Sequence, residues 1–575
     1  MSRRSAVLAT AAVALATAAL FFVSRGKWSD ALIDSGREWI VPDAIARGQT
    51  LYGDVVYWFG PFTPYWQAAF LRTLGSGFPA LVAAGAVTAA GVLAVLFVLL
   101  RRVTDRRSAG IWTALAIPAL VFMPNAGGAL LGMGYRIWQA AGFALAAVAF
   151  AASGNPRRRT LALLAAGACA GLSGLCRTEW GLAAAAGAGL AALVRPRRKA
   201  SGVRDALVIA AAFAFVFAAG IGHFLRTAGA KAVVTDGHVL LTGLPAETRH
   251  FLVAFSGLPD WRTGVLELLY SSATWLGAAA LVTWLAWPAA VARPRGLAVA
   301  IGACLIVLAA TALAGGAGGA VIFSASPLVG LAALVTGLRR RGGTPAATLA
   351  ASGALGLLLS YRRPFHIGDS AYVGPPLLFA LVSAAGLLHL CVASRRSTAV
   401  RARLAPAFRG AAAAVVVAAF AARLWQYASI EAAPIAGTAG MLSAREPLGR
   451  EIEELAKTVR ERTGEGGGLA VFPEGELLNF LSGRPNPIRH KLYLPGYLTA
   501  DNEAEVLREL EARPPAAVVL WRRPVTEYDR ALFGDDYGVA IRRWIEDHYA
   551  LEPFQAPGQP RRANPRFVVG FRRSA

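Results

Sequence analysis

Residues 79–102 of the chain read PALVAAGAVTAAGVLAVLFVLLRR, an apolar run free of charge until it ends in Arg101 and Arg102. About 20 apolar residues in a helix cross the roughly 30 Å of hydrocarbon in a bilayer, and in lipid the backbone must satisfy its own hydrogen bonds. This stretch therefore predicts a membrane-spanning helix with an arginine pair at one end.

Similar apolar blocks recur along most of the chain. They predict further helices near residues 5–24, 108–123, 136–153, 159–175, 179–195, 204–224, 272–292, 297–314, 318–338, 346–361, 373–393 and 410–428. Together with residues 79–100 they make about thirteen spans, and the Ala- and Gly-rich sequence suits close packing of helices in a membrane. We therefore expect an all-α polytopic membrane bundle.

The composition agrees with a membrane protein. Of the 575 residues, 56% are hydrophobic and only 16% are charged, with a mean hydropathy of +0.49, whereas about 25% of the residues in a soluble protein are charged. The formal net charge of +24 could indicate nucleic-acid binding, but no basic stripe is interleaved with aromatic residues as that function requires. We expect the lipid bilayer as a partner and no nucleic acid.

The basic residues lie in every second loop between the predicted spans. The clusters are Arg3–Arg4, Arg101–Arg107, Arg157–Arg159, Arg195–Lys199, Arg293–Arg295, Arg339–Arg341 and Arg395–Arg409. Cytoplasmic loops carry such an excess of Lys and Arg, so the N-terminus is predicted to be cytoplasmic and the C-terminus to lie on the outer side. The first apolar run is longer than the core of a signal peptide, so we expect it to be retained as a span.

Two regions lie outside the spans. The first outer loop, residues 25–77, is too long for a simple connection, and we expect interfacial helices in it. From about residue 440 onward, charged residues become common and apolar runs shorten. Predicted helices at Leu448–Arg462, Asn502–Glu511 and Gly538–Tyr549 alternate there with predicted strands at Gly468–Phe472, Ala516–Leu520 and Phe567–Phe571. We therefore expect a transmembrane domain over residues 1–435 and a small extracytoplasmic α/β domain over residues 440–575.

The first outer loop contains a candidate catalytic cluster. Asp34 and Glu38 are four residues apart, so they share one face of a helix, and Arg37 lies beside them. A carboxylate can take a proton from a hydroxyl group or hold a metal ion, and the aromatic residues of this loop can stack on sugar rings or anchor at the lipid interface. The alternative is an interfacial helix with solvated charges, and both remain open.

Two further clusters place arginine near the predicted outer surface. Arg177 and Glu179 follow the span predicted at residues 159–175, where charges are costly unless they are used or paired; they form either a functional site or an ion pair at a helix start. In a later outer loop, Arg362 and Arg363 are natural partners of a phosphate, and His366 can hydrogen-bond it or bind metal. A structural role is the alternative for this loop as well.

These residues lie in motifs that resemble a known superfamily. Asp34-Ser-Gly-Arg-Glu38, Leu51-Tyr52-Gly-Asp54 and Gly60-Pro61-x-x-Pro64-Tyr65 resemble the first outer loop of polytopic bacterial GT-C glycosyltransferases. The chain looks most like those related to the dolichyl-phosphate-mannose protein mannosyltransferases and the aminoarabinose lipid A transferases. The Arg177-Thr178-Glu179 site, the segment from Arg362 to Pro376 and the tail motif Pro473-Glu474-Gly475…Leu478-Asn479-Phe480 extend the resemblance over nearly the whole chain.

The resemblance implies an inverting transferase that takes a sugar from a polyprenyl-phosphate donor on the outer face of the bacterial inner membrane. Its acceptor is then an envelope glycan, lipid or protein. By the same resemblance Asp34 is the catalytic base, while Glu38 and Asp54 orient the acceptor or, together with Asp34, are the candidates to hold a divalent metal ion. The residues implied to bind the donor phosphate are Arg362, Arg363, Arg177 and His366, supported by Arg37, Glu179, Tyr52 and Tyr65.

Two other functions stay open at this point. The superfamily often has an Asp followed directly by a second acid, but here Ser35 follows Asp34, which leaves room for a non-catalytic envelope-assembly subunit. A transporter or flippase of a lipid-linked envelope precursor is the other alternative. Transporters tend to carry inverted repeats and charged residues near mid-membrane, whereas the charges of this sequence lie at the outer ends of the predicted spans and no repeat is found.

Overall fold

The structure is a computed structural model of the chain. It describes residues 3–124, 127–132, 134–153, 156–195, 199–237, 245–256, 261–262, 265–266, 326–340, 342–359, 374–393, 398–559 and 564–573. The spans predicted near residues 272–292 and 297–314, the start of the span predicted at residues 318–338, and the loop that carries Arg362, Arg363 and His366 lie outside these ranges.

Most of the described chain is a bundle of apolar helices. These are α1 (Arg3–Ser24), α4 (Phe78–Val103), α5 (Arg106–Ala116), α6 (Gly134–Ala151), α7 (Arg159–Cys176), α8 (Thr178–Val194), α9 (Lys199–Thr227), α15 (Ser326–Arg339), α16 (Thr344–Leu359), α18 (Leu377–Ala393) and α19 (Thr398–Ala428). Most of their bounds lie within a few residues of the predicted ranges, whereas α19 begins at Thr398, about three turns before the predicted start at residue 410. Their apolar composition explains this agreement, because it forces helical structure in lipid.

Some of these helices are long and apolar enough to cross a membrane by themselves. Among the described residues four qualify, at Val7–Ser24, Phe78–Val103, Arg159–Cys176 and Ser201–Thr227. Shorter apolar helices lie at Thr178–Val194, Ser326–Arg339, Thr344–Leu359, Leu377–Ala393 and Ala412–Ala428. The structure therefore has the helices of a polytopic membrane protein, while the count of about thirteen spans stays a prediction.

Small residues let the helices approach closely. A Cβ atom added to Gly181 of α8 would lie 2.4 Å from the Gly174 Cα of α7, and one added to Gly353 of α16 would lie 2.4 Å from the Gly330 carbonyl oxygen of α15. Such approach between backbones increases van der Waals contact, which drives helix association in lipid where the hydrophobic effect does not. The glycines of the apolar blocks thus have a packing role.

The C-terminal region forms a small α/β layer beyond one end of the bundle. Its sheet has the strand order β3-β4-β6-β5, in which β3 pairs parallel with β4 and the other pairs are antiparallel. The strands are β3 (Leu469–Phe472), β4 (Ala517–Trp521), β5 (Tyr549–Phe554) and β6 (Phe567–Arg572), and the helices are α20 (Leu448–Arg462), α21 (Leu477–Ser482), α22 (Ala500–Ala512) and α23 (Val539–His548). A two-stranded ribbon of β1 (Ala433–Pro434) and β2 (Ser443–Ala444) precedes them.

One strand differs from the sequence prediction. The predicted helix at Gly538–Tyr549 ends at His548, and strand β5 begins at Tyr549. Strand β5 lies at the edge of the sheet and contains Pro553. Because an edge strand tolerates proline and needs only one hydrogen-bonding partner, its sequence lacks the continuous apolar run that identified the other strands.

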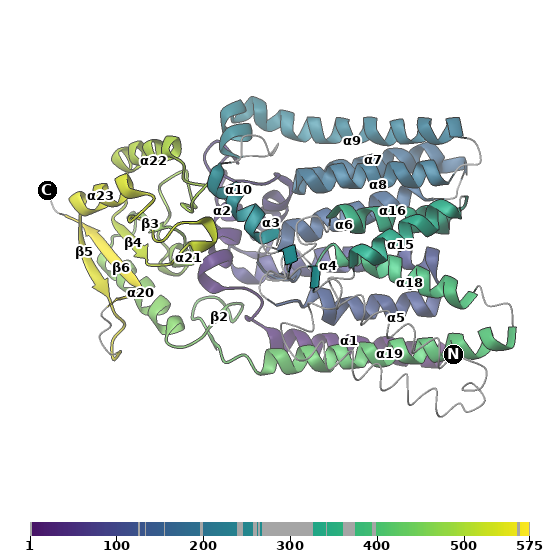
Figure 1. The fold of residues 1–575 in the computed structure, drawn as a ribbon. Helices are drawn as coiled ribbons and strands as arrows, with labels where there is room; N and C mark the ends of the chain where they lie inside the picture. Colours follow the sequence, from purple (N-terminus) through teal and green to yellow (C-terminus); the bar gives the residue numbers. More distant parts are fainter. Residues whose placement is uncertain are drawn as a thin grey trace.

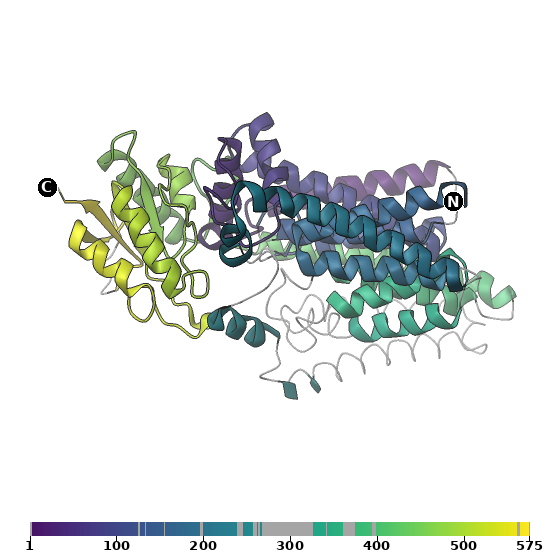
Figure 2. The same ribbon diagram turned by 90° about the horizontal axis from the view of Figure 1, so that it is seen from above.

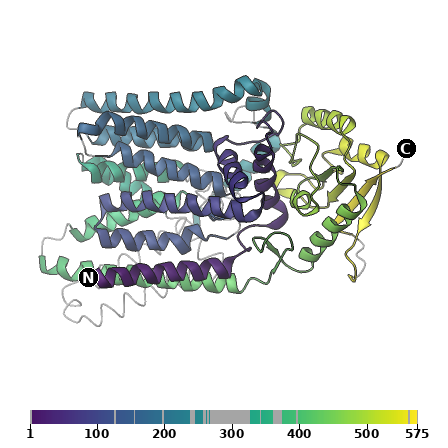
Figure 3. The ribbon, with the colours of Figure 1, turned by 180° about the vertical axis from the view of Figure 1, so that it is seen from behind.

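The first outer loop lies between the bundle and the sheet. It contains the π-helical turn η1 (Ala31–Ser35) and the helices α2 (Gly36–Ala46) and α3 (Phe62–Leu74). Figures 1 and 2 show the C-terminal strands at the end of the bundle opposite the N-terminus, and Figure 3 shows the short helices of this loop at the junction. Aromatic contacts join the parts here, since the Phe480 ring of α21 lies 5.0 Å from the Trp39 ring and 4.8 Å from the Phe78 ring.

Candidate active site

Asp34 lies in a short π-helical turn that its neighbours hold in place. The Asp30 side chain begins the turn by accepting hydrogen bonds from the backbone N–H groups of Leu32 and Ile33, at 2.8 and 2.9 Å. Asp34 is 9% exposed and Ser35 is fully buried. π-Helical turns next to an α-helix are rare and frequently lie at functional sites, so the local backbone is consistent with the role predicted for Asp34.

Two buried ion pairs hold the acidic residues of the loop. Arg37 donates to Asp34 at 2.5 Å, and Arg136 of α6 donates to Glu38 at 2.7 Å. The side chains of Arg136 and Glu38 are 1% and 3% exposed. Asp34, Arg37 and Glu38 are therefore paired inside the protein and are not the solvated charges of the alternative interpretation. A buried charge is tolerated only when it is paired.

Arg177 joins the same cluster through an aromatic ring. It precedes α8 and pairs with Glu179 of the first turn at 2.7 Å. The guanidinium carbons of Arg136 and Arg177 lie 3.7 and 5.3 Å from the centre of the Phe59 ring. Both distances lie within the range of a cation–π contact. Phe59 of the first outer loop thus contacts Arg136 of α6 and Arg177 at the start of α8. The Arg177–Glu179 ion pair at the start of α8 therefore also belongs to this cluster.

Tyr52 fixes the loop that carries Phe59. Its backbone has φ of +66°, which is uncommon for a residue other than glycine. Its side chain is fully buried, and its hydroxyl donates to the Phe59 carbonyl oxygen at 2.5 Å. Burial and this hydrogen bond offset the cost of the left-handed backbone. Tyr52 therefore positions the ring on which the two arginines lie.

The C-terminal region reaches the catalytic loop directly. A Cβ atom added to Gly36 would lie 2.2 Å from the backbone nitrogen of Leu477 and 2.7 Å from the Glu476 carbonyl carbon. The turn that precedes α21 therefore packs on the residue between Asp34 and Arg37. This turn carries two fully buried carboxyl groups, Glu474 and Glu476, which bring further acidic groups close to the Asp34–Arg37 pair.

The two carboxyl groups have unusual protonation. Burial raises the pKa of Glu474 to about 8, although Arg523, at 3.2 Å, and Arg37 oppose this shift. Burial also raises the pKa of Glu476 to about 7. Neither oxygen of Glu474 accepts a hydrogen bond from any residue that the structure describes. Near neutral pH both groups therefore carry protons for much of the time, which lets them lie beside Asp34 without strong repulsion.

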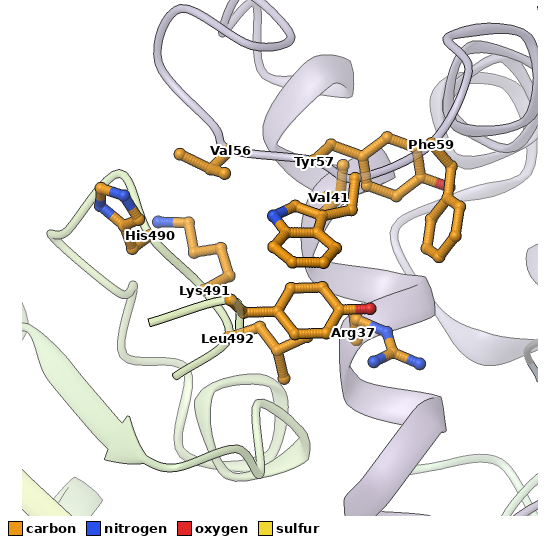
Figure 4. A pocket seen from close by; sticks show the side chains of 10 residues that line it. Arg37, Val41, Val56, Tyr57, Phe59, His490, Lys491 and Leu492 are labelled. Atoms are coloured by element: carbon orange, nitrogen blue, oxygen red, sulfur yellow. The ribbon is translucent and has the colours of Figure 1, made fainter. Parts of the chain in front are cut away.

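A pocket opens next to this cluster, between the first outer loop and the C-terminal region. The pocket is a small hollow that is open to solvent, and Figure 4 shows Arg37 of α2 on one side and His490 and Lys491 of the C-terminal region on the other. The Trp58 and Tyr497 rings stack at its wall with centroids 3.5 Å apart. The remaining lining residues are Val41, Val56, Tyr57, Phe59 and Leu492. The lining therefore combines aromatic rings with the charged side chains of Arg37 and Lys491.

Other predicted site residues lie apart from this cluster. Asp54 is exposed, and its carboxylate accepts a hydrogen bond from the Thr50 backbone N–H at 2.7 Å within a turn. Tyr65 of α3 is 39% exposed, with its ring 5.8 Å from that of Phe224. The predicted phosphate-binding residues Arg362, Arg363 and His366 lie outside the described residues.

The first outer loop does not have the geometry of a metal site. The carboxylates of Asp34, Glu38 and Asp54 each bind a different partner, namely Arg37, Arg136 and the Thr50 backbone N–H, and they do not gather around one point. A divalent ion needs several ligand atoms around one point. Within the described residues, the group that meets this condition is His490, Glu505 and Glu509 of the C-terminal region. No catalytic step is therefore assigned to a metal ion at the loop carboxylates.

Sequence reasoning missed three members of the cluster. Arg136 begins an apolar block, where a charged residue is costly unless paired, and that signal could have identified it. Glu474 and Glu476 belong to a motif noted only as part of the tail. No local signal indicates that this motif meets Asp34, because about 440 residues of sequence separate them and only the docking of the two regions brings them together.

Solved structures similar to this chain identify its fold. No protein-family model matches the chain, and no curated protein matches its sequence. ArnT from Cupriavidus metallidurans in the apo state is similar in structure, with a TM-score of 0.52 at 13% sequence identity, over 99% of this chain and 98% of that chain. The same protein bound to undecaprenyl phosphate gives a TM-score of 0.52 at 14% identity over the same shares.

The chain has the same fold as ArnT. The likeness extends over the helix bundle and the C-terminal region alike, as the coverage of both chains shows. In this fold the described helices form the bundle, and the Asp34 cluster lies at the end of it where the C-terminal region docks.

Proposed function

We propose that this protein is a membrane glycosyltransferase that moves a sugar from a polyprenyl-phosphate donor to an acceptor of the cell envelope. The observation that carries the proposal is a buried cluster of charges at one end of a GT-C bundle. In it Asp34 pairs with Arg37, and Glu38 pairs with Arg136. Burial of so many charges is costly. Such charge clusters persist mostly where chemistry or binding uses them.

Asp34 is the proposed base. Its carboxylate would accept the proton of an acceptor hydroxyl, whose oxygen then attacks the anomeric carbon of the donor sugar. The bond from that carbon to the phosphate oxygen breaks on the opposite side, and polyprenyl phosphate leaves with the electron pair. Attack opposite the leaving group inverts the anomeric configuration. Positioned proton transfer of this kind contributes about 10²- to 10⁴-fold to a rate.

The arginines are the proposed stabilisers of the leaving phosphate. Arg177 and Arg136 lie together at the Phe59 ring, and we propose that Arg362, Arg363 and His366 of the later outer loop complete the group. Fixed cations aimed at a developing negative charge are an effective form of electrostatic catalysis. Glu179 and Glu38 would orient the arginines, and Arg37 would orient the Asp34 carboxylate through their ion pair.

Support for the donor class comes from the similar structure. ArnT from Cupriavidus metallidurans has been solved bound to undecaprenyl phosphate, and this chain has the same fold. We extend this to a polyprenyl-phosphate donor for the present protein, which would bind from the outer leaflet of the bacterial inner membrane. Asp54, at the exposed side of the loop, is proposed to orient the acceptor, and Tyr52 and Tyr65 to support the loop.

The test compares cells that carry the wild type, a deletion, Asp34→Asn or the control Asp535→Asn, at matched expression. Asp535 is exposed and lies in the C-terminal region. We expect the deletion and Asp34→Asn to lose one sugar from an envelope glycan while polyprenyl-phosphate sugar accumulates, and Asp535→Asn to match the wild type. Glycan and lipid-linked-sugar analysis by mass spectrometry gives the readout.

Two results would contradict parts of this proposal. If the deletion leaves every envelope glycan and lipid-linked sugar unchanged, the glycosyltransferase function itself is wrong. If the deletion changes the glycan but Asp34→Asn does not, Asp34 is not the base, and transport of a lipid-linked precursor without chemistry becomes the better explanation.

A further inference from the structure

His490 is a buried histidine with an unusual lack of partners. It is 2% exposed, and neither of its ring nitrogens forms a hydrogen bond with any described residue. Its Nδ1 atom lies 3.5 Å from the Glu509 carboxylate, which is too long for a good hydrogen bond. Burying an imidazole without hydrogen bonds is unfavourable, so such a group calls for a bound water or ion.

Two carboxylates face this histidine from one helix. Glu505 and Glu509 are four residues apart on α22, so they lie on the same face. One ligand atom from each of His490, Glu505 and Glu509 lies within 4.8 Å of the other two. Around a single Zn²⁺ ion, with bonds of about 2.0 to 2.2 Å, ligand atoms are about 3 to 4 Å apart. A small movement of the side chains therefore creates a coordination site.

Basic side chains also surround the carboxylates of the site. Glu505 accepts hydrogen bonds from Arg489 and from Lys231, the latter at 3.0 Å, and these two cations also pair with Asp236, at 2.8 and 3.2 Å. Lys491 is a third basic group and interacts with Glu509, so three carboxylates face three basic side chains. Each carboxylate oxygen accepts more than one partner, so Glu505 can keep its basic partners and still bind an ion.

We propose that His490, Glu505 and Glu509 bind a divalent transition-metal ion, with Zn²⁺ the best fit. One imidazole and two carboxylates form a borderline set of nitrogen and oxygen ligands, which suits Zn²⁺ better than Mg²⁺ or Ca²⁺. Water would complete the coordination. This proposal concerns a structural ion and does not depend on the proposed transferase reaction.

The ion would fasten the wall of the pocket to the C-terminal domain. His490 and the next two residues, Lys491 and Leu492, line the pocket, and Figure 4 shows them on the C-terminal segment that faces Arg37. The preceding residue, Arg489, accepts a hydrogen bond from the Val56 backbone N–H at 3.1 Å. Metal binding by α22 and His490 would therefore hold this segment against the first outer loop.

The test uses purified, full-length, untagged protein in detergent, stripped of metal with a chelator. Zn²⁺ is titrated in competition with a chromophoric chelator, and bound metal is counted by elemental analysis. We expect one tight site in the wild type and at least tenfold weaker binding in His490→Gln and Glu509→Gln. The matched controls His548→Gln and Glu511→Gln alter exposed residues of the same region and should bind as the wild type does.

Any of three results would overturn the proposal. The wild-type protein binds no Zn²⁺, His490→Gln binds Zn²⁺ as tightly as the wild type does, or the control variants lose binding. If a site variant fails to fold, X-ray absorption at the zinc edge of the wild type decides. One imidazole nitrogen with oxygen ligands near 2.0 to 2.2 Å supports the site, and sulfur ligands or a purely aqueous zinc spectrum refute it.

Discussion

At the scale of single residues, the site consists of buried charged side chains, and each is stabilised by a partner of opposite charge. Arg136 is 1% exposed inside the bundle, and Glu38 neutralises it at 2.7 Å. Breaking a buried pair by removing one partner leaves an uncompensated charge, whereas removing both can be nearly neutral. The energetics of the site therefore depend on keeping each pair intact.

We expect Glu38→Gln to destabilise the protein by about 3–5 kcal/mol, because it removes the carboxylate that balances the buried charge of Arg136. The double variant Glu38→Met with Arg136→Met should cost less than Glu38→Gln alone. The exposed pair Arg542–Glu546 is the control, and Glu546→Gln should cost less than about 1 kcal/mol. Thermal unfolding of the purified variants measures these effects; equal losses for Glu38→Gln and Glu546→Gln would contradict the argument.

The protonation of Glu474 gives a second prediction at this scale. Its pKa is raised to about 8 in the folded protein by burial, so the folded state binds this proton more tightly than the unfolded state does. The stability that this group contributes is present at low pH and is lost as the pH rises through about 8. Glu476, with a pKa of about 7, acts in the same direction.

We therefore expect the melting temperature of the wild type to fall between pH 6 and pH 8, and that of Glu474→Gln to fall less over the same range. Glu465→Gln, at an exposed position, serves as the control and should follow the wild type. Differential scanning fluorimetry across pH gives the measurement. A Glu474→Gln profile parallel to the wild-type profile would show that Glu474 is ionised when buried.

At the scale of elements, glycines set how closely the first outer loop meets its neighbours. Gly60 lies against α7, where an added Cβ atom would be 2.0 Å from the Leu175 carbonyl oxygen, and Gly36 lies against the turn before α21. Backbone atoms cannot move aside as a flexible side chain does. These two contacts therefore require glycine for packing and not for backbone conformation.

Gly36→Ala tests this contact. We expect it to destabilise the docking of the C-terminal region by at least about 1–3 kcal/mol, the usual cost of overpacking, and to increase proteolysis between residues 429 and 447. Gly91→Ala in α4 is the control, since no atom lies within 4 Å of its added Cβ, and alanine in a helix is slightly favourable. Limited proteolysis measures the rate of cleavage between residues 429 and 447 in both variants. Equal rates in Gly36→Ala and Gly91→Ala would contradict the packing argument.

At the scale of the whole molecule, the C-terminal region closes over the end of the bundle through charged and aromatic contacts. Arg489 pairs with Asp236 at 2.8 Å and Arg530 with Glu247 at 3.0 Å, each joining the C-terminal region to the segment that follows α9. The pocket and the acidic cluster exist only where these parts meet. Glycosyl transfer, as proposed, should therefore depend on docking as well as on Asp34.

Arg489→Gln should loosen this docking. It removes a partner of Asp236, which is 3% exposed, and so leaves a buried carboxylate with fewer hydrogen bonds. We expect faster hydrogen exchange in the first outer loop and in α22, with helices α7 and α8 unchanged. Arg508→Gln, a substitution on α22 outside these ion pairs, is the control. Unchanged exchange in Arg489→Gln would show that the docking does not depend on the Arg489–Asp236 ion pair.

The sequence by itself determined the apolar helices, the Asp34–Arg37–Glu38 cluster and most strands of the C-terminal sheet. Each depends on local chemistry, because lipid forces an apolar run into a helix and a charge in an apolar setting needs a partner nearby. The tertiary structure alone decided that Arg136 pairs with Glu38, that Phe59 gathers two arginines and that Glu474 meets the Asp34 loop. These contacts join segments about 80 to 440 residues apart, and their formation depends on helix packing and docking, which no local pattern encodes.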